Sequence, residues 1–244
     1  MNKKNLSLIV FGILLIILLW QIFAFIINNS IVLPTLDAVF FALKKLLCSK
    51  ETYIILFLTI VRLLLNIVIS FFVALVLAGI SLYSKSLEIV MRPFLVIIKT
   101  TPVIVIIIIL LVIFGSKNTP MLVTTFVLIP IFYEAIINGT KAIDKNILEE
   151  VSMHSTFNLT ILFKIYIPLI KPYILTSFLQ TFGLGLKTLV MSEFIAQPPK
   201  SIGYEILRYK TSLDMDYIFG WSIILLIFIL LVELILKKMK IQIE

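Results

Sequence analysis

Three basic side chains lie inside long apolar stretches of the sequence: Arg62, Lys99 and Lys187. A cationic side chain at mid-membrane costs roughly 2.5–3.5 kcal/mol on insertion scales, so such residues usually face the protein interior or water. Arg62 and Lys99 could snorkel to an interface, form a structural pair or line a polar pathway. Lys187 lies deeper in its stretch, and it either lines a pathway for an anionic solute or is held in a structural pair.

Pro102 and Glu193 are further candidates for lining a translocation pathway. Pro102 removes one backbone hydrogen bond, which produces either a packing kink or a bend at a gate where water satisfies the freed carbonyl. Lys187 and Glu193 are six residues apart, which places them on different faces of one helix. They cannot form an i,i+4 pair, so each must find water or a partner on another helix.

Residues for catalysis or metal binding are missing from the sequence. It contains one His and one Cys, His154 and Cys48, which excludes an internal disulfide and a cysteine-based zinc site. It also lacks the G-x-x-x-x-G-K-[ST] phosphate loop, so this chain cannot power transport by itself. We therefore expect no enzyme activity, metal or cofactor in the chain, and any ATP would be used by a partner subunit.

Membrane-spanning helices must position the charged residues. Of the 244 residues, 61% are hydrophobic and 14% are charged, and the mean hydropathy is +1.18, which indicates that a bilayer surrounds much of the chain. A spanning helix needs about 20 mostly apolar residues. We predict one all-α membrane domain over residues 1–244, with six spans at residues 6–27, 53–82, 93–114, 121–137, 173–194 and 217–236.

Basic residues predict the orientation of this domain. The segments on the side of the N-terminus hold more Lys and Arg than the opposite segments, which favours both termini in the cytoplasm. Basic helix ends of this kind also explain the net charge of +8 better than binding to nucleic acid does. We expect Glu205, Asp214 and Asp216 to be solvated charges on the outer side.

Two connections between spans have apolar residues at helical spacing. Residues 34–47 form either an amphipathic helix on the outer membrane surface or a loop packed over the bundle. Residues 138–172 form the longest cytoplasmic segment, in which we predict two short helices, the second ended by Pro168 and Pro172. Such a helical pair either docks a cytoplasmic partner or is an ordinary solvated loop.

The second connection resembles the coupling loop of ABC importer permeases, whose motif is E-A-A, three residues, G, nine residues and I-x-L-P. When the motif proline is placed on Pro168, its Glu falls on Glu149 and its Gly on Ser155. Glu150 and Val151 stand at the two alanines. His154, at the apex of the loop, is either solvated or in contact with the ATPase.

Other segments resemble the nitrate, taurine and aliphatic-sulfonate branch of these permeases, in the family's order from Leu33 to the C-terminus. They are LPTLDAV from Leu33, TIVRLLLN with Arg62, KTTPVIVIIIILLVIFG with Pro102, and MSEFIAQPPKSIGYEI with Glu193, Gly203 and Tyr204. The resemblance implies a type I importer permease in the plasma (inner) membrane of a prokaryote. The resemblance also implies how such permeases assemble: two permease chains form a homodimer, two ATPase subunits bind on the cytoplasmic side, and an external binding protein delivers a small solute. In much of this branch the solute is an anion.

An ion-coupled secondary transporter is the alternative function. It predicts inverted internal repeats and paired carboxylates inside the membrane. We find no convincing repeat, and we take Glu193 as the one carboxylate near the interior of a span. A membrane enzyme would need nucleophiles, bases or metal ligands gathered at one depth, which the sequence does not offer.

Overall fold

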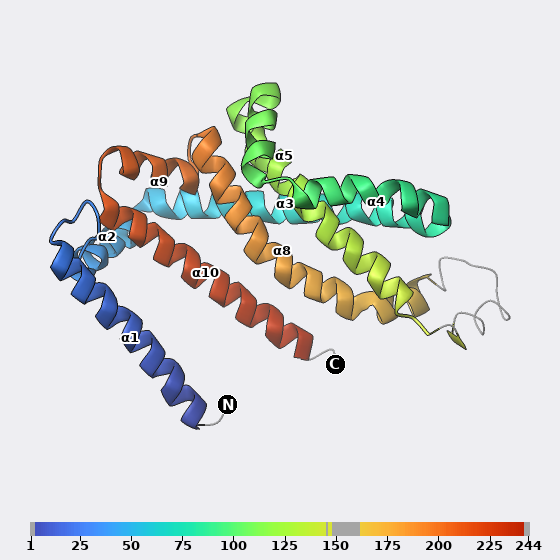
Figure 1. Cartoon of the computed structure of the whole chain (residues 1–244), viewed down its shortest axis with the longest axis horizontal. Coiled ribbons are helices and arrows are strands. Elements are labelled where there is room, and N and C mark those ends of the chain that lie inside the picture. The colour runs from blue at the N-terminus through green and yellow to red at the C-terminus, as the bar shows by residue number, and fades with distance from the viewer. Residues whose placement is uncertain (1–2, 145, 148–161, 242–244) are drawn as a thin grey trace.

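The computed structural model describes residues 3–144, 146–147 and 162–241, and their regular elements are helical, as predicted (Figure 1). Figure 1 uses the labels of the following elements: α1 Lys3–Ile27, α2 Leu36–Cys48, α3 Lys50–Tyr83, α4 Lys85–Thr100, α5 Val103–Lys141, the π-helical turn η1 Leu162–Tyr166, α8 Ile167–Ala196, α9 Ile202–Thr211 and α10 Met215–Ile241.

Five helices of the described chain are long and apolar enough to cross a membrane. They are Ser7–Ile27, Lys50–Tyr83, Val103–Lys141, Lys164–Ala196 and Met215–Ile235. Large apolar side chains remain exposed along them, which is the surface expected of helices that face lipid. The predicted spans at 6–27, 53–82, 173–194 and 217–236 overlap four of these helices.

The predicted span at residues 93–114 is not one helix. Helix α4 ends at Thr100, and Thr101 and Pro102 are extended, with ψ angles of 127° and 129°. Pro102 has no N–H to donate, and its ring disfavours the helical conformation of the preceding residue. With 16 residues, α4 is about 24 Å long, less than the roughly 30 Å of a hydrocarbon core. The described residues thus contain five candidate spans, whereas six were predicted for the chain.

Helix α5 contains the predicted span at 121–137 and bends sharply before it. Gly115 has φ 73° and ψ 174°, a backbone conformation that residues with a side chain rarely adopt. The bend separates a short first part of α5 from the longer second part, as the green segment of Figure 1 shows. Thr119 donates to the Gly115 carbonyl at 2.7 Å, which satisfies one acceptor at the bend.

The core lies where α3, α5 and α8 pack together. Phe132 of α5 is fully buried, and its ring lies 5.4 Å from Phe71 of α3 and 4.9 Å from Phe178 of α8. Gly185 of α8 faces Leu63 and Leu128, and an added Cβ would meet them at 3.0 and 3.2 Å. A small residue therefore lets these helices approach closely, as expected in membrane bundles.

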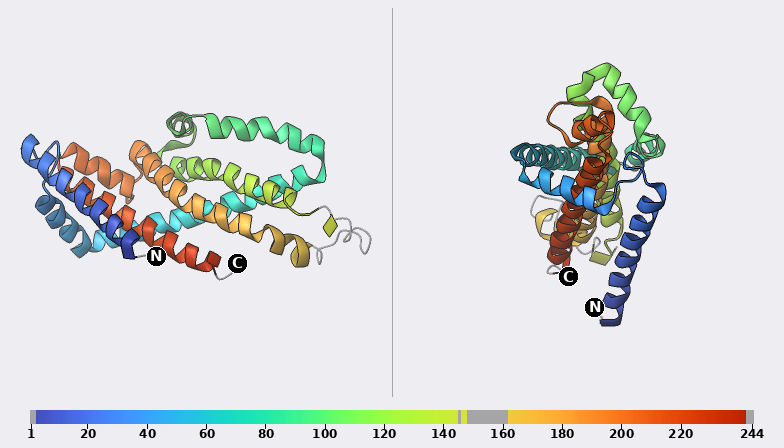
Figure 2. Two further views of the ribbon diagram at one scale, coloured as in Figure 1. Left: turned by 60° about the horizontal axis from the view of Figure 1, so that its bottom comes forward. Right: turned by 90° about the vertical axis from the view of Figure 1, so that its left-hand side faces the viewer.

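Several helix ends of the described chain lie toward one end of the bundle. In Figure 1, α1 and α8 begin, and α5 and α10 end, toward the lower and right-hand side. Helix α1 stands apart from the bundle in Figure 1 and in the right-hand view of Figure 2. Its later part contacts the rest through Trp20, whose ring lies 4.6 Å from Phe219 and whose Nε1 donates to the Pro34 carbonyl.

Two short helices lie at the opposite end. The predicted segment 34–47 forms a helix rather than a loop, with α2 running from Leu36 to Cys48. Thr35 caps α2 by accepting from the Ala38 N–H, and Val39, Ala42 and Leu46 are buried. Helix α9 was not predicted. Its Ile202 packs with Leu46 of α2 and Trp221 of α10.

Both ends of the predicted loop at residues 138–172 are helical in the described part of the chain. Helix α5 continues to Lys141, and η1 leads directly into α8, which already contains Pro168 and Pro172. The prediction that these prolines end a helix was wrong for Pro168, because η1 runs directly into α8 and Pro168 lies in the first turn of α8. Pro172 lies inside α8 without ending it.

Candidate functional site

Of the five residues predicted for the coupling loop, only Pro168 lies in the described part of the chain, within the first turn of α8. Glu149, Glu150, His154 and Ser155 lie outside the described residues. The candidate site is therefore built from the charged residues of the spans.

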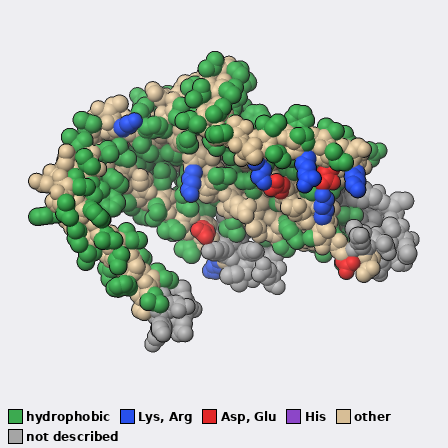
Figure 3. Space-filling model, viewed as in Figure 1, with side chains coloured by type: hydrophobic (Ala, Val, Ile, Leu, Met, Phe, Trp, Pro, Cys, Tyr) green, Lys and Arg blue, Asp and Glu red, His purple; other side chains and the backbone are tan. Residues whose placement is uncertain are grey.

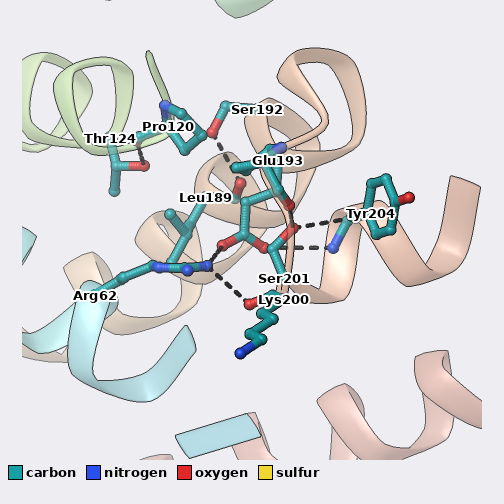
Figure 4. Close-up of polar contacts among 11 residues, drawn as sticks. Arg62, Pro120, Thr124, Leu189, Ser192, Glu193, Lys200, Ser201 and Tyr204 are labelled. Atoms are coloured by element: carbon teal, nitrogen blue, oxygen red, sulfur yellow. Dashed lines mark hydrogen bonds and ion pairs between the residues drawn. The ribbon is translucent and has the colours of Figure 1, made fainter. Parts of the chain in front are cut away.

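Glu193 of α8 is fully buried and has two partners from other helices (Figure 4). Its Oε1 lies 3.1 Å from Nη1 of Arg62 on α3, and its Oε2 accepts from the Gly203 N–H at 3.3 Å. Arg62 Nη1 also donates to the Lys200 carbonyl at 3.3 Å. A buried carboxylate needs such a cation and donor, because desolvation without them is costly.

The chain turns tightly between α8 and α9 to bring Gly203 back to Glu193. Gln197 and Lys200 have φ angles of 58° and 55°, which lie in the left-handed region. Ser201 then caps α9, accepting from the Tyr204 N–H at 3.2 Å and donating to the Pro198 carbonyl at 2.7 Å. The cap therefore starts α9 close against the last turn of α8.

This close approach leaves no room for a side chain at residue 203. A Cβ on Gly203 would lie 2.3 Å from the Phe194 nitrogen and 2.5 Å from Glu193 Cβ. Arg62, Glu193 and Gly203 thus tie three helices together. Sequence reasoning left Glu193 to find either water or a partner on another helix, and the structure places Arg62 of α3 beside it.

Lys99 and Glu134 form a second ion pair, which joins α4 to α5. Lys99 Nζ of α4 lies 2.7 and 2.8 Å from the two carboxylate oxygens of Glu134 on α5. Unlike the first pair, both side chains are almost half exposed, at 47% and 46%. They line a hollow of about 660 Å³ between α4, α5 and α8, together with Asn138, Tyr173, Thr176 and Gln180 among others.

Sequence reasoning missed Glu134. Glu193 was taken as the one carboxylate near the interior of a span, yet Glu134 lies within the predicted span at 121–137. A carboxylate in an otherwise apolar span was the signal that could have found it. A further pair, Lys141 with Glu88, also joins α5 to α4. In Figure 3 the blue and red side chains gather over the part of the molecule where α4 lies, while green covers most of the rest.

Lys187 and Pro102 do not line this hollow. Lys187 is exposed on α8 beside a more apolar hollow of about 400 Å³ that includes Val190, Phe194 and Leu225. Within the described ranges, Lys187 makes no ion pair. Pro102 is exposed at the break between α4 and α5.

Glu205 was predicted to be solvated, and this was wrong. Its side chain is only 11% exposed and lies 3.0 Å from Arg208, one turn away on α9. Burial raises the pKa of Glu205 above its ordinary value, and the Arg208 charge opposes that rise. Glu205 lines a small hollow of about 210 Å³ with Lys45, Glu51 and Trp221, at the end of the bundle where α2 and α9 lie.

Long apolar helices joined by ion pairs, with a polar hollow among them, define a polytopic helical membrane protein. The family model of the binding-protein-dependent transport system inner membrane component matches residues 70–238. The chain belongs to this family.

Two curated relatives share part of the sequence. The glycine betaine/proline betaine transport system permease protein ProW of Escherichia coli (strain K12) is 28% identical over 144 residues, which is 58% of this chain and 40% of ProW. ProW of Salmonella typhimurium matches to the same extent. The chain thus spans about 40% of the length of these relatives. The substrates in their names, glycine betaine and proline betaine, give no support to the nitrate, taurine and aliphatic-sulfonate branch.

A solved structure supports the fold. An inward-facing structure of the MetNI methionine ABC transporter superposes with a TM-score of 0.65 and 12% sequence identity. The match covers 76% of this chain and 93% of that chain. At this identity the likeness concerns the arrangement of helices, which is that of an ABC importer permease.

Proposed function

We propose that the chain is the membrane-spanning permease subunit of an ATP-driven importer, which moves a small solute delivered by an external binding protein. The family match over residues 70–238 carries this proposal. That range contains the last part of α3 and the helices α4, α5 and α8, which build the polar hollow. ATP would be hydrolysed by separate subunits, because the chain has no phosphate loop.

In the proposed assembly two copies of the chain surround the pathway and two cytoplasmic ATPase subunits dock on the connection between α5 and α8. The ion pairs argue against the alternative of an ion-coupled secondary transporter. Such a transporter needs carboxylates that are free to take up the coupling ion. Glu134 and Glu193 are each bound to a basic side chain instead.

The experiment is to co-express the chain with candidate ATPase and binding-protein genes from its source genome, to purify the complex and to measure uptake by vesicles. We expect two copies to co-purify with two ATPase subunits, and uptake to require ATP. A monomeric chain that moves solute without ATP or partners would refute the proposal. The binding protein's own ligand, extracted and identified, would also separate the sulfonate branch from betaine-like substrates.

The proposed orientation places both termini and the docking connection in the cytoplasm of a prokaryotic cell. Lys85, Arg92, Lys141 and Lys171 lie toward that end of the bundle, which the preference for basic residues on the cytoplasmic side favours. Cys48 tests this, because it is exposed, is the one cysteine of the sequence and ends α2 at the opposite side. A membrane-impermeant maleimide should label it in intact cells, whereas labelling only after permeabilisation would reverse the orientation.

A further inference from the structure

We propose that the hollow between α4, α5 and α8 is a binding subsite for a small zwitterion. Lys99 would bind the carboxylate or sulfonate of the solute, and Glu134 its ammonium group. This inference rests on the proposed function, because it names the class of solute that moves along the proposed pathway.

The two ion pairs differ in a way that marks one of them as accessible. Glu193 is fully buried against Arg62, as expected of a pair that fastens helices. Lys99 and Glu134 lie as close to each other, yet each is almost half exposed. Charges inside a membrane protein that remain exposed are expected to face water or a polar ligand rather than lipid. Both charged groups of this pair can therefore be reached from the hollow.

The pairing of one positive and one negative side chain in the hollow favours a solute that carries both charges. One cation and one carboxylate stand side by side, and the two carboxylate oxygens share a single ammonium. An anion that took Lys99 would leave Glu134 unpaired beside a second negative charge, and a cation that took Glu134 would do the reverse to Lys99. A zwitterion replaces both partners at once, so no charge is left unmatched.

The remaining lining suits such a solute. Asn138, Thr176 and Gln180 provide hydrogen-bonding side chains, and Tyr173 provides an aromatic ring that can contact an ammonium or trimethylammonium group. The volume of about 660 Å³ falls within the roughly 300–1,000 Å³ of small-molecule sites. This lining differs from the cationic, anion-selective one that the sequence suggested for Lys187.

The test compares each zwitterion with an anion of the same shape, using the full chain in lipid nanodiscs and calorimetric titration. The pairs are glycine betaine with 3,3-dimethylbutanoate, proline with cyclopentanecarboxylate and taurine with propanesulfonate. We expect at least one zwitterion to bind about tenfold more tightly than its anionic counterpart. Choline, which keeps the cation of glycine betaine but lacks the carboxylate, should also bind weakly. If no zwitterion binds, or if the anions bind as tightly, the proposal is wrong.

Variants show whether the pair itself recognises the solute. Lys99→Met and Glu134→Gln should each weaken zwitterion binding about tenfold or more, and Glu134→Gln should shift the preference toward the anion. A purely structural pair would not change the preference. The double variant Lys99→Glu with Glu134→Lys restores the pair and should restore zwitterion binding, which keeps the test valid if a single variant fails to fold.

Glu88→Gln is the matched control, because it breaks a pair between the same two helices outside the hollow. It should leave zwitterion binding unchanged. Unchanged binding in Lys99→Met and Glu134→Gln would overturn the inference. Co-purification with the ATPase and ATP-dependent uptake are measured separately. An assembly that transports without zwitterion binding refutes this inference alone, and a chain that fails to assemble refutes the proposed function.

Discussion

Replacing Gly203 by Ala should break the contact between α8 and α9. The added Cβ would lie 2.3 Å from the Phe194 nitrogen and 2.6 Å from the Glu193 carbonyl carbon, and backbone atoms cannot move aside as a flexible side chain can. Overpacking of this kind typically costs about 1–3 kcal/mol. Moving α9 away would also lengthen the 3.3 Å bond from the Gly203 N–H to Glu193, and a hydrogen bond to a charged group contributes about 1.5–3 kcal/mol.

We therefore expect Gly203→Ala to destabilise the chain by about 3 kcal/mol, since the hydrogen bond is long and is lost only in part. At about 2–4 °C per kcal/mol for a chain of this size, the melting temperature falls by about 6–12 °C. Tryptophan fluorescence during heating can follow this, because Trp221 is 1% exposed and packs against Ile202 beside the substituted residue.

Gly183→Ala is the control for this experiment. Nothing lies within 4 Å of a Cβ at Gly183, and the residue is inside α8. Alanine favours a helix over glycine by roughly 0.5–1 kcal/mol, so this variant should melt at the same temperature or slightly higher. If Gly203→Ala melts like Gly183→Ala, the close approach of α9 to α8 and the reasoning built on it are wrong.

Three further predictions concern charged residues. Glu193→Ala should lower the melting temperature more than Glu134→Ala, because Glu193 is fully buried and its loss leaves Arg62 unpaired, whereas the Glu134 pair is half exposed; equal effects would contradict this. The raised pKa of Glu205 means that the folded chain holds this proton more tightly than the unfolded chain. Stability should therefore fall as the pH rises from the ordinary pKa near 4.5 through the raised one. Glu205→Gln should flatten that part of the pH–stability curve, and an unchanged slope would exclude the assignment. Lys187→Met should leave the melting temperature unchanged, because the exposed ammonium has no ion pair in the described ranges; a lower value would indicate a structural role.

Local sequence was sufficient for the elements that interact mainly with lipid. Helices α1, α3 and α10 follow long apolar runs, and hydropathy over about 20 residues measures their fit to the bilayer directly. Helix α2 was also predictable as one of two alternatives, because its apolar residues recur at helical spacing. In these elements the surrounding lipid or water determines which residues are apolar, so the hydropathy of the sequence is enough to predict the helix.

Contacts between distant parts of the chain were not predictable in the same way. Arg62 and Glu193 are 131 positions apart, and the sequence around each residue does not indicate that the other is its partner. The burial of Glu205 likewise depends on how α9 packs over α2 and α10, and α9 itself was not predicted because its mean hydropathy is low for a span. Sequence reasoning could state that a buried charge needs a partner, but only the fold shows which residue that partner is.

The break at Pro102 connects the missed span to the proposed subsite. A continuous helix over residues 93–114 would place Lys99 on a single long rod beside α3. Because α4 stops at Thr100 instead, Lys99 lies in its last turn, where unpaired carbonyls favour a cation. The same break lets the first part of α5 leave the direction of α4 (Figure 1). Lys99 then meets Glu134 on the second part of α5 beside the polar residues of α8. In the proposed subsite, Pro102 therefore acts through the position of Lys99 rather than as a simple packing kink or a lining residue.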